Sequence, residues 1–172
     1  MKAKRIFKEY IYKSINAFPP IKVIFSGKHL YELQFLKELP VNSFKEKLTE
    51  EEKRLLSNLK KDLRKFFLGG RVNFRKYSIK FFKGTDFQKK VWKAIKTVPY
   101  GQTHSYKWLA EKIGNIKSFR AVGTACGKNP LPIIIPCHRI ISLNGSLGGY
   151  SAGVDLKMQL LHIEKVSERN RI

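Results

Sequence analysis

The sequence contains few cysteines, few acidic residues and no long run of apolar residues. Two cysteines in 172 residues cannot form a disulfide framework, so a reducing compartment is expected. No stretch approaches the roughly 18 consecutive apolar residues of a membrane helix, and the basic N-terminus is broken by further charges, unlike a secretory signal. We therefore expect a soluble, cytoplasmic protein without a membrane partner.

Basic residues greatly outnumber acidic ones. The chain has 35 lysines and arginines against 13 aspartates and glutamates, which gives a net charge of +22. Its hydrophobic content of 42% is high enough for a folded core, which argues against a disordered chain. A surface this positive favours a polyanionic partner, nucleic acid before an acidic membrane. The alternative is that the lysines reflect an unusual cellular environment, because charge alone names no function.

Residues 1–83 have the pattern of a small sheet-and-helix domain. Two β-prone segments with a turn between them predict a hairpin over residues 21–35. Thr49 and Glu52 form a capping-box pattern ahead of apolar residues at helical spacing, which predicts a long helix that ends at a glycine pair. The segment 73–83 is expected to be a strand or a linker. We find no catalytic motif in this half.

Residues 84–172 are predicted to form a second, mostly helical domain, so the fold class is mixed α/β (α+β). Ser105 and Ser118 are candidate N-caps of two short helices, and Gly114 lies in the turn between them. Two short helices joined by a glycine-containing turn indicate a helix-turn-helix. The boundary between the two domains is expected near residues 83 and 84.

The second helix of that pair has an unusual outer face. Phe119, Val122 and Cys126 are expected to pack inward. The outer face carries one basic and several small side chains, namely Arg120, Ala121, Gly123, Thr124 and Gly127. Small side chains allow a helix to approach another surface closely, either a DNA groove or a second protein helix. The positive charge of the chain favours DNA.

The proline-rich segment 129–141 carries the reactive residue types. Its prolines are expected to hold an extended, buried ribbon that presents Cys137 and His138 at a fixed place. A cysteine thiol ionises little at neutral pH, so it needs a nearby base or positive charge to become a strong nucleophile. Since neighbouring residues of a strand face opposite sides, a Cys–His contact would require a turn or a bridging water. A buried structural cysteine is the alternative.

Two further features follow this segment. The glycine-rich loop 144–153 lacks the Gly-Lys-Ser/Thr ending of a phosphate loop and is predicted to form a pocket wall. The last predicted helix, 155–164, ends at Glu164, a carboxylate that either orients an imidazole or is simply solvated. Cys126 and Cys137 lack the spacing of a metal site and the histidines are scattered, so neither a metal nor a cofactor is expected.

Residues 84–164 resemble the O6-alkylguanine-DNA alkyltransferases, also called methylated-DNA–protein-cysteine methyltransferases. The resemblance rests on a series of ordered motifs, at residues 84–88, 99–101, 105–106, 120–123, 129–130, 135–141 and 148–151. Its most specific part is the Pro-Cys-His-Arg sequence at residues 136–139. The N-terminal half resembles the family only in its layout of sheet and helix.

The resemblance implies irreversible repair of alkylated DNA. A monomer would bind double-stranded DNA through the minor groove, rotate the damaged nucleotide out of the helix and transfer the alkyl group from O6-alkylguanine to Cys137. O4-alkylthymine is a further candidate substrate. A water-bridged relay through His138 to Glu164 would activate Cys137, and Tyr106 would assist rotation and hydrogen-bond the base. Asn129 would brace the turn between the recognition helix and the reactive segment.

The resemblance also implies which residues bind the DNA and the base. Arg120 would fill the gap left by the rotated base, with Ala121 and Thr124 on the same groove-facing side. Tyr150 would pack against the alkyl group, and Ser151 would hydrogen-bond O6 of guanine. Some relatives bind zinc through cysteines and histidines of the N-terminal half, but here that half has no cysteine and a single histidine, so no zinc site is expected.

Two other classes of function are compatible with the same residues. A DNA-binding regulator would use the helix-turn-helix and keep Cys137 only as a structural or sensing thiol. Such regulators normally dimerise to read two-fold operators, and the sequence has no obvious dimerisation element. A cysteine hydrolase would need a leaving-group acid and an oxyanion hole, which no motif marks. Transfer of an alkyl group to the protein itself would distinguish repair from both.

Overall fold

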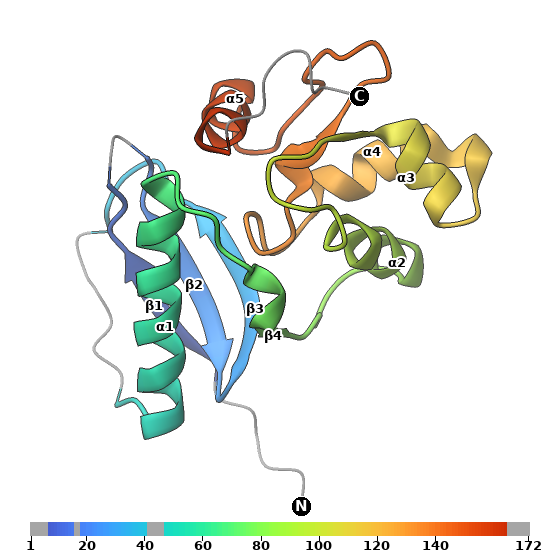
Figure 1. Ribbon diagram of the computed structural model, residues 1–172. Coiled ribbons are helices and arrows are strands. Elements are labelled where there is room, and N and C mark those ends of the chain that lie inside the picture. The colour runs from blue at the N-terminus through green and yellow to red at the C-terminus, as the bar shows by residue number, and fades with distance from the viewer. Residues whose placement is uncertain (1–6, 16–17, 41–46, 165–172) are drawn as a thin grey trace, which may run out of the picture.

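The computed structural model describes residues 7–15, 18–40 and 47–164 (Figure 1). In its N-terminal half, a helix packs across a four-stranded sheet of order β1-β2-β3-β4. The first three strands pair in antiparallel, and the short fourth strand pairs in parallel with β3. The strands are β1 (Lys8–Tyr12), β2 (Ile21–Ser26), β3 (His29–Phe35) and β4 (Ser78–Ile79).

The predicted hairpin and the predicted long helix are both present. Strands β2 and β3 are joined by a tight turn, and alternate residues of β2 are buried, namely Ile21, Val23 and Phe25. The helix is α1 (Glu50–Phe67), and reciprocal hydrogen bonds of Thr49 and Glu52 close its N-terminus as the sequence predicts. The segment 73–83 contains the 3-10 turn η1 (Phe74–Lys76) and β4 rather than a longer strand.

The C-terminal half is mostly helical, so the predicted mixed α/β class is confirmed. Its helices are α2 (Asp86–Ile95), α3 (Tyr106–Lys112), α4 (Phe119–Gly127) and α5 (Val154–Ile163), and the 3-10 turn η2 (Ile116–Ser118) joins α3 to α4. Helix α4 packs against α2 and α3, and the α3–α4 pair lies on the side of the molecule away from the sheet (Figure 1). None of the helices in the described ranges is long and apolar enough to cross a membrane.

One of the two predicted helix caps in the helix-turn-helix is wrong. The Ser105 side chain accepts a hydrogen bond from the Trp108 amide and caps α3 as predicted. Ser118 precedes α4, but its hydroxyl donates to the Asn115 carbonyl and makes no capping bond. The reason is that η2 leads directly into α4, so the backbone of Ser118 is already turned and its side chain faces back along the chain.

The reactive segment is turned, not extended as predicted. Residues 131–135 form turns, and Ile133 has a φ of +72°, which is rare for a β-branched residue. The 3-10 turn η3 (Cys137–Arg139) follows and leads into β6 (Ile140–Ile141), which pairs in parallel with β5 (His104–Ser105). Every residue from 133 to 141 is buried, so the segment is still rigidly placed. Proline fixes φ at a value that suits a turn as well as a strand.

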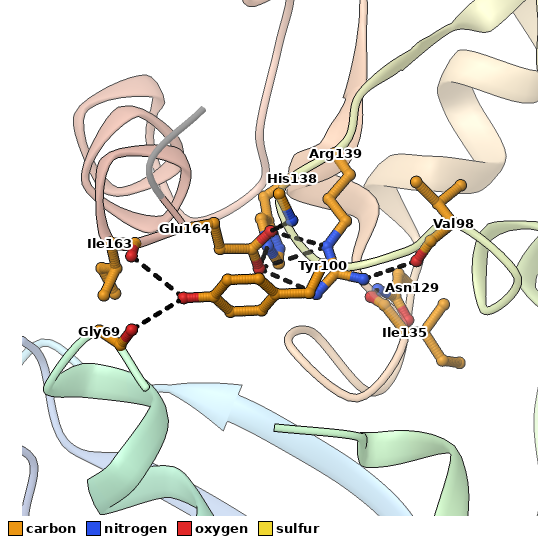
Figure 2. Close-up of polar contacts among 10 residues, drawn as sticks. Gly69, Val98, Tyr100, Asn129, Ile135, His138, Arg139, Ile163 and Glu164 are labelled. Carbon is orange, nitrogen blue, oxygen red and sulfur yellow. Dashed lines mark hydrogen bonds and ion pairs between the residues drawn. The ribbon is translucent and has the colours of Figure 1, made fainter. Parts of the chain in front are cut away.

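The N-terminal half contacts the reactive segment directly. The Leu33 amide of β3 donates to the Pro130 carbonyl over 2.8 Å. The Tyr100 hydroxyl lies 3.2 Å from the carbonyl oxygen of Gly69 and 3.1 Å from that of Ile163 (Figure 2). The Leu33 bond ties the sheet to the reactive segment, and the Tyr100 bonds tie the end of α1 and the end of α5 to the loop between α2 and β5.

Candidate functional site

A pocket of about 530 Å³ lies between the helix-turn-helix and the glycine-rich loop, and the buried Cys137 is among the residues that line it. Its walls are formed by Tyr106, Gly123, Thr124, Cys126, Gly127, Ser142, Gly148, Gly149, Tyr150 and Ser151. The predicted pocket wall is therefore confirmed for residues 148–151. A volume of this size is typical of sites for small organic groups.

The Cys137 thiol is buried and hydrogen-bonded. The Asn129 side-chain amide donates to Sγ over 3.0 Å and to the Ile135 carbonyl over 2.7 Å, while its oxygen accepts from the Leu131 amide over 3.0 Å. Burial raises the pKa of Cys137, and the Asn129 bond and the nearby Lys157 charge oppose that rise. Asn129 thus braces the turn, as expected from the family resemblance, and also contacts the sulfur, which the sequence analysis missed.

The His138 imidazole contacts the Glu164 carboxylate in a network of hydrogen bonds and ion pairs (Figure 2). Nε2 of His138 lies 2.9 Å from Oε1 of Glu164, and both side chains are fully buried. Arg139 donates to both carboxylate oxygens, over 2.9 Å from Nη2 and 3.0 Å from Nε. The Gly101 amide donates to Oε2 over 3.0 Å. Glu164 is therefore not a solvated helix end, and it orients the imidazole.

The network sets the charge of its members. Burial raises the pKa of Glu164, but His138 and Arg139 outweigh this effect and lower it to about 2. Burial lowers the pKa of His138, against the opposing effect of the carboxylate. A neutral imidazole whose Nε2 donates to Glu164 keeps a lone pair on Nδ1. That nitrogen is buried and has no hydrogen-bond partner in the described parts of the chain, so it is placed to accept a proton.

Lys157 is a buried cation beside the site that the sequence analysis missed. Its ammonium group donates to the Ile140 carbonyl over 2.6 Å and to the Leu147 carbonyl. Burial lowers its pKa to about 8, and the two cysteines oppose that shift. The two carbonyls belong to β6 and to the glycine-rich loop, so Lys157 ties the loop to the reactive segment and supplies positive charge near the thiol. The only signal in the sequence is its position next to Leu156 on the inner side of α5.

Two tyrosines line the pocket next to the thiol. Burial raises the pKa of Tyr106 to about 12, and its hydroxyl donates to the Gly149 carbonyl over 3.4 Å. The Tyr150 hydroxyl is buried and makes no well-formed hydrogen bond to a described residue, and burial together with Cys137 raises its pKa. Both phenols stay protonated and can donate. Gly148 has a φ of +64°, and a Cβ there would lie 3.1 Å from the Tyr106 ring, so the loop requires glycine at this position.

The exposed face of α4 borders the pocket and differs from the prediction at one residue. Arg120, Ala121, Thr124 and Gly127 are exposed and Gly123 is partly exposed, as predicted. Val122 and Cys126 are buried, also as predicted. Phe119 is not buried: 49% of its surface is exposed. It is the first residue of α4, where a side chain leans back beyond the end of the helix rather than onto the core. Ser151 is exposed at the pocket rim.

The site has no donor set for a metal ion. Within the described residues, no three histidine, cysteine, aspartate or glutamate side chains gather at one point. Nε2 of His138 faces Glu164, and both oxygens of that carboxylate face Arg139. The reactive groups at and beside the pocket are the Cys137 thiol, the His138 imidazole and the phenols of Tyr106 and Tyr150.

The fold and the site define a helix-turn-helix protein that holds a buried, hydrogen-bonded cysteine in a pocket beside its second helix. A family model described as 6-O-methylguanine DNA methyltransferase, DNA binding domain, matches residues 86–166. A methylated-DNA–protein-cysteine methyltransferase of Methanosarcina barkeri is 40% identical over 152 residues, which cover 85% of this chain and 90% of the relative. The chain belongs to the methylated-DNA–protein-cysteine methyltransferase family.

Two further relatives extend the comparison. The enzyme of the same name from Mycobacterium tuberculosis is 53% identical over 83 residues, 48% of this chain and 50% of the relative. The crystal structure of Mycobacterium tuberculosis OGT in complex with DNA matches with a TM-score of 0.74 and 31% identity, over 96% of this chain and 98% of that one. Similarity thus covers the N-terminal half as well as the helical half.

Proposed function

We propose that this protein repairs DNA by moving the alkyl group of O6-alkylguanine, and of O4-alkylthymine as a second candidate, to its own Cys137. Family membership supports the repair reaction. The observation that carries the assignment to Cys137 is that its buried thiol lines the pocket, accepts a hydrogen bond from Asn129 and belongs to the residue just before His138. The thiolate attacks the alkyl carbon, the S–C bond forms, and the C–O6 bond breaks.

The electron pair of the broken bond leaves with guanine, which then needs a proton or strong hydrogen bonds. Tyr106 and Ser151 line the pocket and are suitable donors, and Tyr150 packs beside the alkyl group. The product is a thioether on Cys137, which neutral water does not hydrolyse. Each molecule therefore acts once, without a cofactor.

The proton of Cys137 passes through a bridging water to Nδ1 of His138. Support comes from that nitrogen, which is buried and unpaired among the described residues, while Nε2 is held by the charged Glu164. The carboxylate stabilises the imidazolium that forms, and Lys157 stabilises the thiolate. Glu164 is a positioning residue, because it acts through His138.

The DNA is bound through its minor groove, with the damaged nucleotide rotated into the pocket. Arg120, Ala121 and Thr124 lie on the exposed face of α4 at the pocket mouth, where small side chains allow close approach. Arg120 fills the space left in the base stack. Rotation costs a few kcal/mol, which contacts in the groove must offset.

We also infer a monomer that acts in the cytoplasm and consists of two domains, residues 1–83 and 84–172. The N-terminal domain supports the reactive segment through the Leu33–Pro130 bond and through the Tyr100 hydroxyl.

The assignment is tested by comparing two cysteine variants. Cys137→Ser should bind DNA like the parent protein but lose nearly all alkyl transfer, because a hydroxyl is far less ionised than a thiol at neutral pH. Cys126→Ala is the matched control, since Cys126 is also buried and borders the same pocket. It should keep transfer. Undiminished transfer of a labelled methyl group from DNA to Cys137→Ser would refute the assignment.

A further inference from the structure

Helix α4 has an exposed apolar side chain, Phe119, to which the proposed function assigns no role. Phe119 has 49% of its surface exposed, and Ile116, on the turn just before the helix, has 62% exposed. The rest of the exposed face of α4 consists of small residues and Arg120. Phe119, the first residue of α4, is therefore the one large apolar side chain that is exposed on this helix.

A single exposed phenylalanine is common on protein surfaces and by itself indicates nothing. Phe82 is the instructive comparison, because 46% of its surface is exposed and the Lys83 ammonium lies 5.5 Å from its ring centroid. Phe82, however, packs against Phe7 and Tyr31. Phe119 makes no ring–ring contact in the described part of the chain. Its ring has the Arg120 guanidinium 5.9 Å from its centroid.

We propose that Phe119 is an apolar wedge that enters the minor groove together with Arg120. The inference rests on the proposed function, in which α4 lies in that groove and Arg120 fills the vacated position in the stack. The Phe119 ring then lies against the base step next to that position and holds it open. Minor-groove proteins use phenylalanine in this way, because an inserted ring replaces part of the lost stacking between bases.

The surroundings of Phe119 fit this role. Lys117, two residues before it, and Arg120, the next residue, are both exposed, so two cations that can contact phosphates lie close to the ring in the chain. The exposed residues Ala121 and Thr124, which follow on α4, have small side chains, so Phe119 and Arg120 are the large exposed groups at the start of this helix. In the free protein, the contact between the guanidinium and the ring keeps the two side chains adjacent before DNA binds.

The test compares Phe119→Ala, Phe119→Trp and the control Phe82→Ala on two substrates. The first is a duplex that contains O6-methylguanine, and the second is the free base O6-benzylguanine, which needs no groove and reacts readily at its benzylic carbon. Phe119→Ala should slow single-turnover transfer from the duplex by about tenfold, the loss expected from one aromatic–base stack. Its rate with the free base should stay within about twofold of the parent, since the pocket is untouched. Phe119→Trp should restore most of the duplex rate.

A second readout reports the wedge directly. A 2-aminopurine placed next to the lesion fluoresces more strongly when it is unstacked. Binding of the parent or of Phe82→Ala should raise its emission, and binding of Phe119→Ala should raise it clearly less. Phe119→Ala combined with Arg120→Ala should also repair the duplex more slowly than Arg120→Ala alone, because the ring contacts DNA in its own right.

The outcomes separate this inference from the proposed function. If neither the parent protein nor any variant transfers the alkyl group from either substrate, the proposed function is refuted. If the parent is active and Phe119→Ala repairs the duplex at the parental rate, the wedge is refuted. It is equally refuted if Phe119→Ala slows the duplex and free-base reactions to the same extent, or if the double variant matches Arg120→Ala.

Discussion

Glu164 is held in its charged form by His138 and Arg139, and this makes the stability of the protein depend on pH. Its pKa of about 2 lies below the ordinary value of 4.5, so the folded state binds this proton more weakly than the unfolded state. The stabilisation is complete above about pH 4.5 and is lost as the pH falls towards 2. It amounts to about 3 kcal/mol at neutral pH.

Glu164→Gln should therefore lower the free energy of unfolding by about 3 kcal/mol at pH 6 and by roughly half as much at pH 3. Urea unfolding at the two pH values measures both differences. Glu111→Gln is the control, because Glu111 is an exposed carboxylate on α3. It should follow the parent protein at both pH values. An equal loss for Glu164→Gln at pH 6 and pH 3 would contradict the assigned charge.

Some residues of the site could be identified from the sequence, and others could not. Cys137, His138 and Asn129 could be selected from the sequence because their residue types and motif are specific. Lys157 could not, since a lysine is almost never fully buried and its partners are carbonyls that only the tertiary fold brings together. The left-handed Ile133 could not be predicted either, because this conformation is unfavourable for the residue itself and is imposed by the burial of the whole segment.

Helix α4 has the role of opening the DNA duplex in the proposed function, and Arg120 is its central residue. Arg120→Ala should slow repair of a lesion in duplex DNA far more than reaction with the free base or with a short single strand. The reason is that only the duplex has a stack from which a base must be removed. Single-turnover rates on the three substrates measure the effect. Equal losses on all three would exclude a role in filling the stack.

Local signals predict some elements well and others poorly. The capping box at the start of α1 was predictable, because both of its bonds join residues that are three positions apart. The spacing of Phe119, Val122 and Cys126 also has helical periodicity, yet it fails for Phe119, since periodicity does not say where the neighbouring helices end. Strand β1, with the sequence KEYIY, was not predicted, because its hydrogen bonds to β2 are long-range.

The charge of the whole molecule predicts how it binds DNA. A net charge of +22, together with the few base-reading side chains on the helix that enters the groove in the proposed function, favours sequence-tolerant contacts to phosphates. Affinity for an undamaged duplex should fall by more than about tenfold between roughly 50 and 200 mM salt, because the binding releases condensed counterions. A titration by fluorescence anisotropy on two unrelated sequences measures this. An affinity that is insensitive to salt, or that differs strongly between the sequences, would contradict the prediction.

The fold class could be predicted from the sequence, but the contacts that join the two halves of the chain could not. Hydrophobic patterning indicated a sheet-and-helix half followed by a helical half. It did not indicate that Leu33 and Gly69 of the first half would bond to Pro130 and Tyr100 of the second. These contacts join residues that are far apart in the sequence, and no local pattern records them. They place the reactive segment on a support that the helical half alone does not provide.

In the proposed function, Cys137 is the final acceptor of the alkyl group. The most direct measurement is the intact mass of the protein after reaction with an excess of duplex DNA that contains O6-methylguanine, followed by peptide mapping. The mass should increase by a single methyl group, the increase should map to Cys137, and it should stop at one equivalent per molecule. Tight binding of the damaged DNA without any gain in mass, or repair of many lesions by one molecule, would contradict it.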